Sequence, residues 1–441
     1  MTDRALEAIR RAALWFEPGS DGIAPLVEAI GDATVVLIGE ASHGTHEFYR
    51  IRADLTAVLI ERKGFNLVAA EADWPDAYRA NRWVRLSSAD TDPAAALGAF
   101  TRFPRWMWRN DVVVDFLTWL RDFNAHRQAA LRVGFYGLDL YSLHSSMKAV
   151  LRYLDQVDPA AARRARDRYG CFGPSGSDPQ GYGYAATLGL SASCEREVLA
   201  QLVELRARAA DYMSRDGFVA EDDYFFAEQN ARLVLNAEQY YRSMFGGRAE
   251  SWNLRDTHMM ETLESLMAWT RRRSGEARAV VWAHNSHLGD ARATQMGEWG
   301  ELNLGQLARQ RHASDAYLVG FTTHTGTVTA ARDWDEPAER RRLRPSLEGS
   351  YERLFHDVDM SRFLLLLNEE PVRSVLNASR LERAVGVVYK PESERTSHYF
   401  RARLADQFNA VVHVDETKAL TPLERWSRED ADLPETYPTG V

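Results

Sequence analysis

Short apolar runs, most of them rich in β-branched residues, recur along this chain and alternate with amphipathic stretches. Each run is nearly continuous, which is typical of a strand buried on both faces of a parallel sheet. The runs span Thr34 to Ile38, Asn66 to Ala70, Arg132 to Tyr136, Ala279 to Ala283, Ala316 to Phe321, Ala384 to Tyr389 and Ala410 to Val414. We expect these segments to be strands of the core.

The segment after the first run has helical periodicity. Its apolar residues fall on one face of a helix and are Phe48, Ile51, Leu55, Val58 and Leu59. Gly64 is the kind of residue that commonly follows the last turn of a helix. A strand, a helix and a second strand in this order predict a right-handed crossover and parallel pairing.

The middle of the chain has a different pattern. It is helical from Leu143 to Tyr169 and from Glu195 to Met244, and the stretch between them, Gly173 to Gly183, is rich in Gly, Pro and Ser and is expected to be a loop. We therefore predict an α/β fold with a mainly parallel sheet flanked by helices. A helical insertion forms a second subdomain. The expected boundaries are 1–140 and 250–441 for the two halves of the core and 141–249 for the insertion.

The composition is that of a globular protein with an acidic balance. The 441 residues are 45% hydrophobic and 27% charged, and the formal net charge is −9. Because phosphate contacts need a basic surface, this balance argues against a nucleic acid partner, and it gives no reason to expect a membrane partner. The first residues contain no apolar stretch suited to a signal peptide, and no run is long enough to span a membrane. We therefore expect a cytoplasmic protein.

Cys171 and Cys194 are the only cysteines in the sequence. They form no CxxC pair, and two cysteines do not make a disulfide framework, so the sequence indicates a reducing compartment. Neither cysteine stands at the end of a predicted strand, and neither is expected to be a nucleophile.

Carboxylates and histidines follow four of the predicted strands. The polar segments are Gly39-Glu40 with Ser42-His43-Gly44, then Glu71 with Asp73, then Gly137-Leu138-Asp139, then His284-Asn285-Ser286-His287. In open α/β sheets ligands bind at the carboxyl ends of the strands, so we expect these side chains to meet at one edge. Each residue alone also has a structural explanation, such as a helix cap or a surface pair. Their convergence favours a functional site, because charged groups at a buried sheet end must be paired or have shifted pKa values.

The residue types indicate attack by an activated water molecule. A neutral His43 can take a proton from water near pH 7. Glu40 or Glu71 can fix its tautomer and stabilise the imidazolium that forms. His284 can protonate a leaving group or bind an oxyanion, and Arg52, in the following helix, can stabilise developing negative charge.

Two common hydrolase signatures are absent from the sequence. There is no GxSxG motif, and His46-Glu47 lacks the second histidine of HExxH. A metal site made of His43, His284, Glu40 and Glu71 stays open, since these are acceptable zinc or manganese ligands. No ligand spacing is diagnostic, so we predict no metal and no cofactor.

Several separated motifs resemble the erythromycin esterase family over residues 30 to 420. They are Val36 to Gly44, Ala70 to Trp74, Trp282 to His287, Gly300 to Gly305 and Tyr389-Lys390-Pro391. The resemblance implies a hydrolase of an ester or lactone, macrolide-like or another small molecule, in which a histidine activates water without a covalent serine. By motif position the base is His43. The supporting residues would be Glu40, Arg52, Glu71, His284 and His287. The resemblance also implies a deep cleft between the α/β core and the helical part.

The chain looks closer to a broad branch of this family, sometimes labelled with succinoglycan biosynthesis, than to the dedicated antibiotic resistance enzymes. The segments Arg102 to Asn110 and Glu394 to Phe400 have the look of that branch. The residues expected to contact substrate are Arg52, Asp73, Trp106, Arg255 and His287. Trp106 either lines an apolar pocket with its aromatic neighbours or packs in the core. Arg255 either faces the cleft or pairs with a helix carboxylate.

Two other functions fit the same residues. The first is an acyl transfer or cyclisation in a biosynthetic pathway, with the same base acting on an alcohol. The second is a protein that binds a metal or cofactor through the histidine cluster. Labelled water oxygen in the product would identify hydrolysis, and elemental analysis would identify a bound metal.

Overall fold

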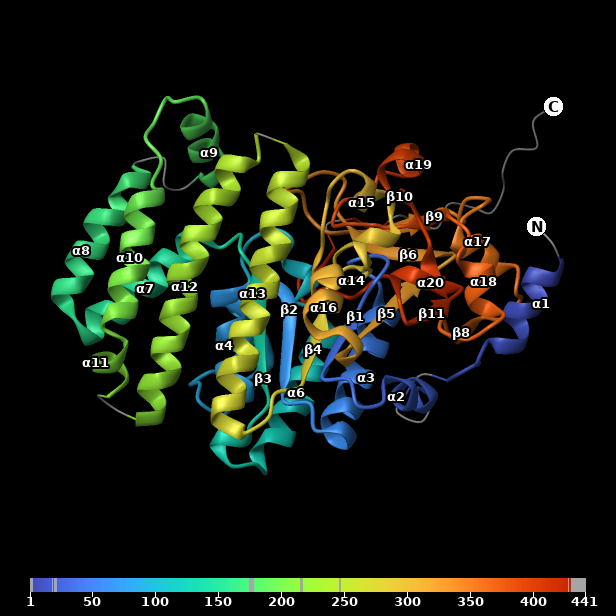
Figure 1. The fold of residues 1–441 in the computed structure, drawn as a ribbon, viewed down its shortest axis with the longest axis horizontal. Coiled ribbons are helices and arrows are strands. Elements are labelled where there is room, and N and C mark those ends of the chain that lie inside the picture. The colour runs from blue at the N-terminus through green and yellow to red at the C-terminus, as the bar shows by residue number, and fades with distance from the viewer. Residues whose placement is uncertain are drawn as a thin grey trace.

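A seven-stranded sheet forms the centre of the computed structural model (Figure 1). The structure describes residues 3–17, 19, 22–173, 178–214, 217–245, 247–426 and 428–429. The strand order is β3-β2-β4-β1-β5-β11-β8. The strands span Val35–Ile38 (β1), Leu67–Asp73 (β2), Gly134–Asp139 (β3), Ala279–Trp282 (β4), Ala316–Thr322 (β5), Arg362–Leu366 (β8) and Ala410–Val414 (β11). Neighbouring strands run parallel, except that β8 is antiparallel to β11.

Six of the seven predicted strands are confirmed as β1, β2, β3, β4, β5 and β11. Their side chains alternate between two hydrophobic clusters, as expected for strands covered on both faces: Val35 and Leu37 belong to one cluster, and Val36 and Ile38 to the other. The edge strand β8 was not predicted. Its apolar residues are one Phe and several Leu, which lack the β-branching that marks the other runs.

The predicted strand from Ala384 to Tyr389 is wrong. The structure has only isolated bridges there, from Val385 to Ser42 and from Val388 to Ala331. The backbone of the segment bonds to three separate places and not to one strand, because the Ala384 N–H donates to His398, the Val385 N–H to Ala41 and the Tyr389 N–H to Ala331. The segment therefore braces the loop that follows β1.

Helices cover both faces of the sheet. One face packs against α2 (Ala24–Ile30), α3 (His46–Lys63), α4 (Trp74–Val84) and α6 (Asp111–Ala125), and the other against α1 (Asp3–Ala12), α13 (Arg248–Ser274) and α16 (Leu304–His312). All five apolar residues predicted for the helix after β1 are buried in α3. Gly64 ends this helix with a left-handed φ of 71°, as expected.

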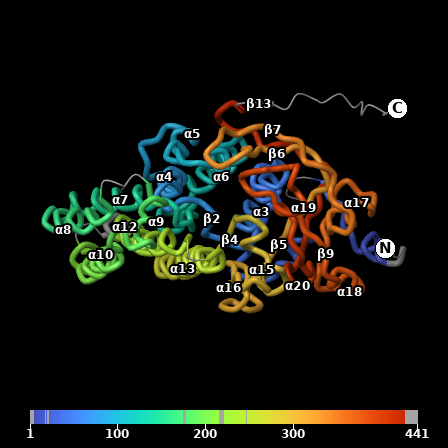
Figure 2. The backbone as a smooth tube through the Cα atoms, turned by 90° about the horizontal axis from the view of Figure 1, so that it is seen from above, coloured from blue at the N-terminus to red at the C-terminus, as the bar shows by residue number. Residues whose placement is uncertain are grey.

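The middle of the chain forms a group of helices to one side of the sheet (Figures 1 and 2). They are α7 (Leu143–Val157), α8 (Pro159–Tyr169), α9 (Pro179–Thr187), α10 (Glu195–Ala207), α11 (Ala209–Met213) and α12 (Gly217–Ser243). The predicted loop from Gly173 to Gly183 is wrong from Pro179 onward, where α9 begins, and residues 174–177 lie outside the described part of the chain. Asp178 caps α9 and Pro179 starts it, a helix signal that the abundance of glycine obscured.

A disulfide joins Cys171, after α8, to Cys194, before α10. This bond was not predicted from the sequence, which indicated no disulfide framework. Their spacing of 23 residues carries no local signal. Packing of α8, α9 and α10 brings the two ends of the segment together.

The remaining elements are short. Helices are α5 (Pro93–Ala96), α14 (Asn285–Leu288), α15 (Gln295–Glu298), α17 (Tyr351–His356), α18 (Val372–Leu376), α19 (Glu394–Ser397) and α20 (Leu404–Gln407). The strands β9 (Arg380–Arg383) and β10 (Tyr399–Ala402) pair with each other, and β12 (Glu416–Thr417), β6 (Thr325–Ala330), β7 (Glu339–Leu343) and β13 (Arg428–Glu429) form a small sheet. Across the described ranges, no helix combines the length and apolar character needed to cross a membrane.

Candidate active site

The loop after β1 lies in a narrow space between other segments. A Cβ at Gly39 would lie 2.2 Å from Asn285 Oδ1, and one at Gly44 would lie 1.8 Å from the Thr329 carbonyl oxygen. Only glycine permits such close approach of backbone and neighbour. The Gly44 carbonyl accepts hydrogen bonds from the backbone of Thr329 and Leu420. The loop that carries Glu40 and His43 is therefore held from both sides.

Glu40 orients His43 within this loop. His43 Nδ1 lies 2.9 Å from Glu40 Oε1, and both side chains are buried. Since an ionised carboxylate can only accept, Nδ1 carries the hydrogen and Nε2 keeps its lone pair. This is the tautomer that a general base needs.

Arg52 lies behind Glu40. Its Nη2 is 3.2 Å from Glu40 Oε2, and its side chain is 0% exposed. The guanidinium packs over the rings of Tyr49 and Trp282, at 4.3 and 5.0 Å from their centroids. Arg52 was expected to contact substrate. The structure places it on Glu40, the carboxylate partner of His43, and away from solvent.

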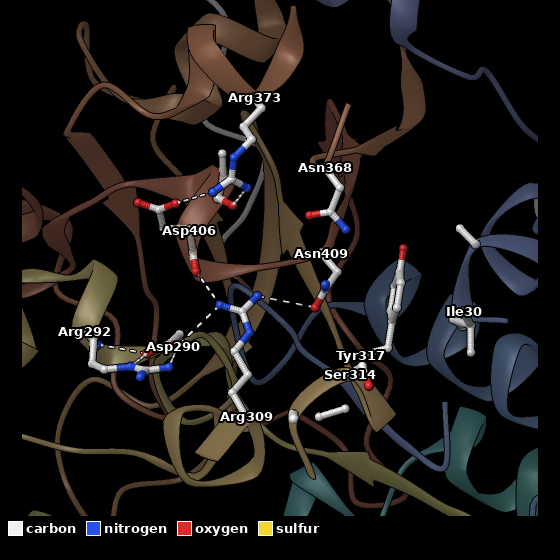
Figure 3. Close-up of a pocket in the computed structure, with 14 residues that line it drawn as sticks. Ile30, Asp290, Arg292, Arg309, Ser314, Tyr317, Asn368, Arg373, Asp406 and Asn409 are labelled. Carbon is white, nitrogen blue, oxygen red and sulfur yellow. Dashed lines mark hydrogen bonds and ion pairs between the residues drawn. The ribbon is translucent and has the colours of Figure 1, made fainter. Parts of the chain in front are cut away.

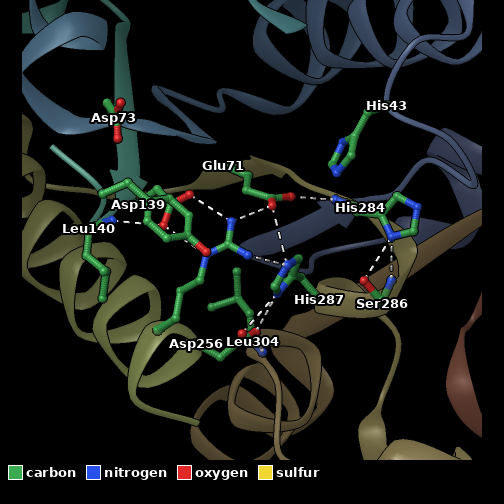
Figure 4. Close-up of polar contacts among 12 residues, drawn as sticks. His43, Glu71, Asp73, Asp139, Leu140, Asp256, His284, Ser286, His287 and Leu304 are labelled. Atoms are coloured by element: carbon green, nitrogen blue, oxygen red, sulfur yellow. Dashed lines mark hydrogen bonds and ion pairs between the residues drawn. The ribbon is translucent and has the colours of Figure 1, made fainter. Parts of the chain in front are cut away.

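Glu71, at the end of β2, joins three elements (Figure 4). Its Oε1 pairs with Arg255 Nη2 from α13 at 2.7 Å, and its Oε2 accepts the backbone N–H of His284 at 3.0 Å. Arg255 also pairs with Asp139 at the end of β3, with Nη2 at 2.7 Å from Oδ2. Burial acts to raise the pKa of Glu71, but His287, Arg255 and His43 outweigh it and hold the pKa well below its usual range.

The ring of His284 lies beside that of His43, with centroids 4.8 Å apart (Figure 4). The Ser286 backbone N–H donates to His284 Nδ1 at 3.2 Å, so Nε2 carries the hydrogen. Burial and the adjacent His43 hold the pKa of His284 well below its ordinary value, while Glu71 and the nearby Ala41 carbonyl oppose this. His284 is therefore a neutral hydrogen-bond donor beside His43.

His287 is held by carboxylates on both ring nitrogens. Nδ1 lies 2.9 Å from Asp256 Oδ2, and Nε2 lies 3.3 Å from Glu71 Oε1 and 3.0 Å from Arg255 Nη1. The ring stacks on Trp252 at 4.5 Å. Burial lowers the pKa of His287, but Asp256 and Glu71 outweigh it, so the pKa is raised overall.

Two residues expected to contact substrate lie outside this group of contacts. Asp73 pairs with Arg102, with Oδ2 at 2.8 Å from Nη2, and burial raises the pKa of Asp73 despite that pairing. Trp106 is buried in a hydrophobic cluster and packs edge-on against Phe103, with ring centroids 5.3 Å apart. The geometry thus joins Glu40, His43, Glu71 and His284 with Arg52, Arg255 and His287.

Sequence reasoning did not assign roles to Asp256 and Asp139. Asp256 is fully buried in α13 on the same stripe as Met260, Leu263 and Met267. A carboxylate in an apolar helical stripe must have a buried partner, which is the signal that would have singled it out. Asp139 was noted at a strand end, but nothing local indicated that Arg255, 116 residues away, is its partner.

The histidines and carboxylates do not form an obvious metal centre. Within the described ranges, no group of three or more His, Cys, Asp or Glu side chains is arranged to hold a metal ion. A cavity of about 890 Å³ lies between α4 and the helices α7 and α12, and Asp76, Tyr78 and Phe226 contribute to its lining. It is not lined by His43 or His284.

Comparison with known proteins gives consistent matches. The erythromycin esterase family model matches residues 60–417, a range that includes Glu71 and His284 and begins after Glu40, His43 and Arg52. The chain is 22% identical to an erythromycin esterase type II of Escherichia coli, over 90% of this chain and 93% of that protein. It is 19% identical to a putative hydrolase, YbfO, of Bacillus subtilis, over 68% and 67% of the two chains.

Solved structures share the fold. A succinoglycan biosynthesis protein superimposes with a TM-score of 0.74 at 18% identity, covering 95% of this chain and 98% of the other. An erythromycin esterase variant in its open conformation gives a TM-score of 0.64 at 16% identity, covering 90% and 94%. These likenesses establish the mixed α/β fold with a mainly parallel sheet.

Proposed function

Because the chain belongs to the erythromycin esterase family, which indicates an esterase-like hydrolase, we propose that it hydrolyses an ester or lactone. In this proposal His43 is the general base. The observation that carries the proposal is the 2.9 Å contact from His43 Nδ1 to Glu40, which in the neutral ring leaves the lone pair of Nε2 to accept a proton. The neutral His284 ring beside it supplies a donor for the oxygen of the reacting carbonyl.

The proposed reaction uses one water molecule and no covalent enzyme intermediate. His43 Nε2 accepts a proton from water as the water oxygen attacks the carbonyl carbon. The carbonyl oxygen becomes negative and accepts a hydrogen bond from His284 Nε2–H. The carbon–oxygen bond of the ester then breaks, and the leaving alkoxide takes the proton from the His43 imidazolium. The products are a carboxylic acid and an alcohol, which stay joined in one molecule if the substrate is a lactone.

The surrounding charges act as positioning residues. Arg52 pairs with Glu40 next to His43 and acts on the base through that carboxylate. Glu71 fixes the backbone of His284, and Arg255 and His287 hold Glu71. Arg255 and His287 also stay the proposed contacts for substrate, and Asp73 and Trp106 are proposed to contact its more distant parts.

The decisive experiment compares His43→Gln with His46→Gln on a panel of macrolides, lactones and simple esters. His46 is a histidine three residues further along, at the start of α3 and more exposed than His43. We expect His43→Gln to lower kcat by about 10²-fold or more, with an unchanged thermal unfolding curve, because it removes the general base. His46→Gln should keep wild-type turnover. Full activity of His43→Gln on a confirmed substrate would contradict the proposal.

Isotope labelling separates hydrolysis from the alternative acyl transfer or cyclisation. In water enriched with oxygen-18, a hydrolytic product carries the label in its carboxylate, which mass spectrometry detects. Transfer to an alcohol or cyclisation leaves the product unlabelled. An unlabelled product from an active preparation would therefore replace hydrolysis with transfer while leaving the role of His43 as base in place.

A further inference from the structure

A second cavity, of about 630 Å³, lies where β5 and β11 begin (Figure 3). It is therefore at the amino ends of these strands, whereas His43 follows the carboxyl end of β1. Arg292, Arg309 and Arg373 line it together with Asp290 and Asp406. These residues come from the segment after α14, from α16, from α18 and from α20. Side chains from four separate segments thus converge on one space.

The arginines around this cavity outnumber the carboxylates that pair with them. Asp290 Oδ2 accepts from Arg292 at 2.6 Å and from Arg309 at 3.2 Å. Asp406 likewise pairs with Arg373 at 2.8 Å and, outside the cavity lining, with Arg403 at 3.1 Å. The lining therefore holds three guanidinium groups and two carboxylates, an excess of one positive charge, and Arg403 outside the lining shares one of these carboxylates.

Arg309 is the innermost of these charges. Its guanidinium donates to the Asp406 carbonyl and to Asn409 Oδ1 as well as to Asp290. Its side chain is 21% exposed, against 54% for Arg292 and 42% for Arg373. Burial lowers the pKa of Arg309 despite the neighbouring Asp290, which means that its charge is incompletely compensated. An anion in the cavity would supply the missing compensation.

The opposite side of the cavity is less polar. Figure 3 shows Tyr317 and Ile30 across from the arginines. The Tyr317 ring is buried, and no hydrogen bond to its hydroxyl is found within the described residues. The cavity therefore offers guanidinium donors at one end and an apolar wall with a free hydroxyl at the other.

We propose that this cavity binds a small organic anion, with its carboxylate or phosphate on Arg309 and Arg373 and its apolar body against Tyr317. The guanidinium fork matches the paired oxygens of both anions, and it recognises them through the same hydrogen bonds. This binding site is separate from the proposed hydrolytic site, because it lies at the opposite ends of the strands and contains none of the residues assigned to hydrolysis.

Calorimetric titration of the whole protein with benzoate and with phenyl phosphate tests this proposal. Both probes carry an anion on a small apolar ring, and benzyl alcohol is the neutral control of similar size. We expect both anions to bind and benzyl alcohol not to bind, and we expect the affinity to fall when the salt concentration rises. If phenyl phosphate binds and benzoate does not, the ligand is a phosphate, and the opposite result identifies a carboxylate. Absence of binding by both anions would overturn the proposal.

Matched variants locate the site. Arg373→Gln should weaken binding about tenfold or more, since a charge-assisted hydrogen bond is lost. Arg403→Gln is the control: it removes the same charge from the same carboxylate at similar exposure, 44% against 42%, but lies outside the lining. It should change the affinity by less than about threefold, because only the screened long-range field changes. Equal losses in the two variants would show that a diffuse positive field attracts the anion and would overturn a defined site.

A third variant separates this site from the hydrolytic centre, where a carboxylate could bind as a reaction product. His43→Gln should leave benzoate binding unchanged if the cavity is the binding site. Loss of binding in His43→Gln together with full binding in Arg373→Gln would place the anion at the hydrolytic centre and refute the cavity. Neither result depends on whether the protein hydrolyses esters.

Discussion

At His43, the hydrogen bond made by Nδ1 determines whether Nε2 can accept a proton. Because Glu40 accepts the hydrogen of Nδ1, Nε2 is available to accept a proton. Glu40 is held by Arg52 in turn, and Arg52 is enclosed by two aromatic rings. The environment of His43 therefore depends on Glu40 and Arg52, both of which are buried.

Replacement of Arg52 tests this dependence. Arg52→Met leaves Glu40 buried without its cation and should lower the free energy of unfolding by about 3–5 kcal/mol in urea denaturation. Arg52→Lys restores a charge but not the planar stacking, so it should recover part of the stability and show a lowered kcat with little change in KM. Arg50→Met is the control, because Arg50 is 48% exposed in the same helix and pairs with Asp54 near the surface. If Arg50→Met were as destabilising as Arg52→Met, burial of the ion pair between Arg52 and Glu40 would not explain the loss of stability.

His398 should make stability depend on pH. Its Nε2 accepts the Lys390 backbone N–H at 3.0 Å, and burial lowers the pKa of His398 to about 4. The unfolded chain, with a histidine pKa of about 6.5, binds the proton more readily. The stabilising contribution is therefore complete above about pH 6.5 and is lost as the pH falls towards 4, by up to about 3 kcal/mol. Urea denaturation at several pH values in this window measures the free energy of unfolding. This free energy should depend less steeply on pH for His398→Gln than for the wild type, and an identical pH dependence would contradict the assignment.

At the scale of elements, the loop between β1 and α3 is positioned by its neighbours. Gly44 lies against Thr329 of β6, and the 384–389 segment braces Ala41 and Ser42. The strand and helix on either side were predicted from periodicity alone. The neighbours of the loop were not predicted, because bracing by single bridges leaves no repeating pattern in the sequence.

Gly44→Ala tests the close approach. The new Cβ would overlap the Thr329 carbonyl and push the loop away from β6, so we expect a loss of about 1–3 kcal/mol or more in stability together with reduced turnover. Gly170→Ala is the control, since Gly170 has an ordinary φ of −61° and no atom within 4 Å of its added Cβ. Thermal unfolding and ester turnover of the two variants measure the difference. Wild-type behaviour of Gly44→Ala would show that the loop can move freely.

At the scale of the whole molecule, the helical part carries its own covalent link. The disulfide between Cys171 and Cys194 closes a segment that includes α9. Closing a loop of this length is worth about 3 kcal/mol in the chain-entropy model. A reductant should therefore lower the unfolding temperature of the oxidised protein, as measured by calorimetry. The Cys171→Ala/Cys194→Ala double variant should be insensitive to the reductant, and an equal effect on both proteins would exclude the disulfide as the cause.

The same disulfide bears on the expected location of the protein. Disulfides persist in oxidising compartments and are rare in cytoplasm. The cytoplasmic location remains a prediction from the sequence. Thiol titration of the freshly isolated protein measures the redox state of both cysteines and so tests that prediction.

The sequence by itself determined the parallel core and the edge at which the candidate site lies. Each buried strand needs apolar residues on both faces, and Glu40, Glu71 and His284 follow such apolar runs, so they could be placed together from local patterns. The tertiary structure alone decided which charges pair. Arg255 reaches Glu71 across 184 positions, and Arg52 turns inward to Glu40. Such contacts depend on how helices pack on the sheet, and this packing cannot be predicted from local periodicity.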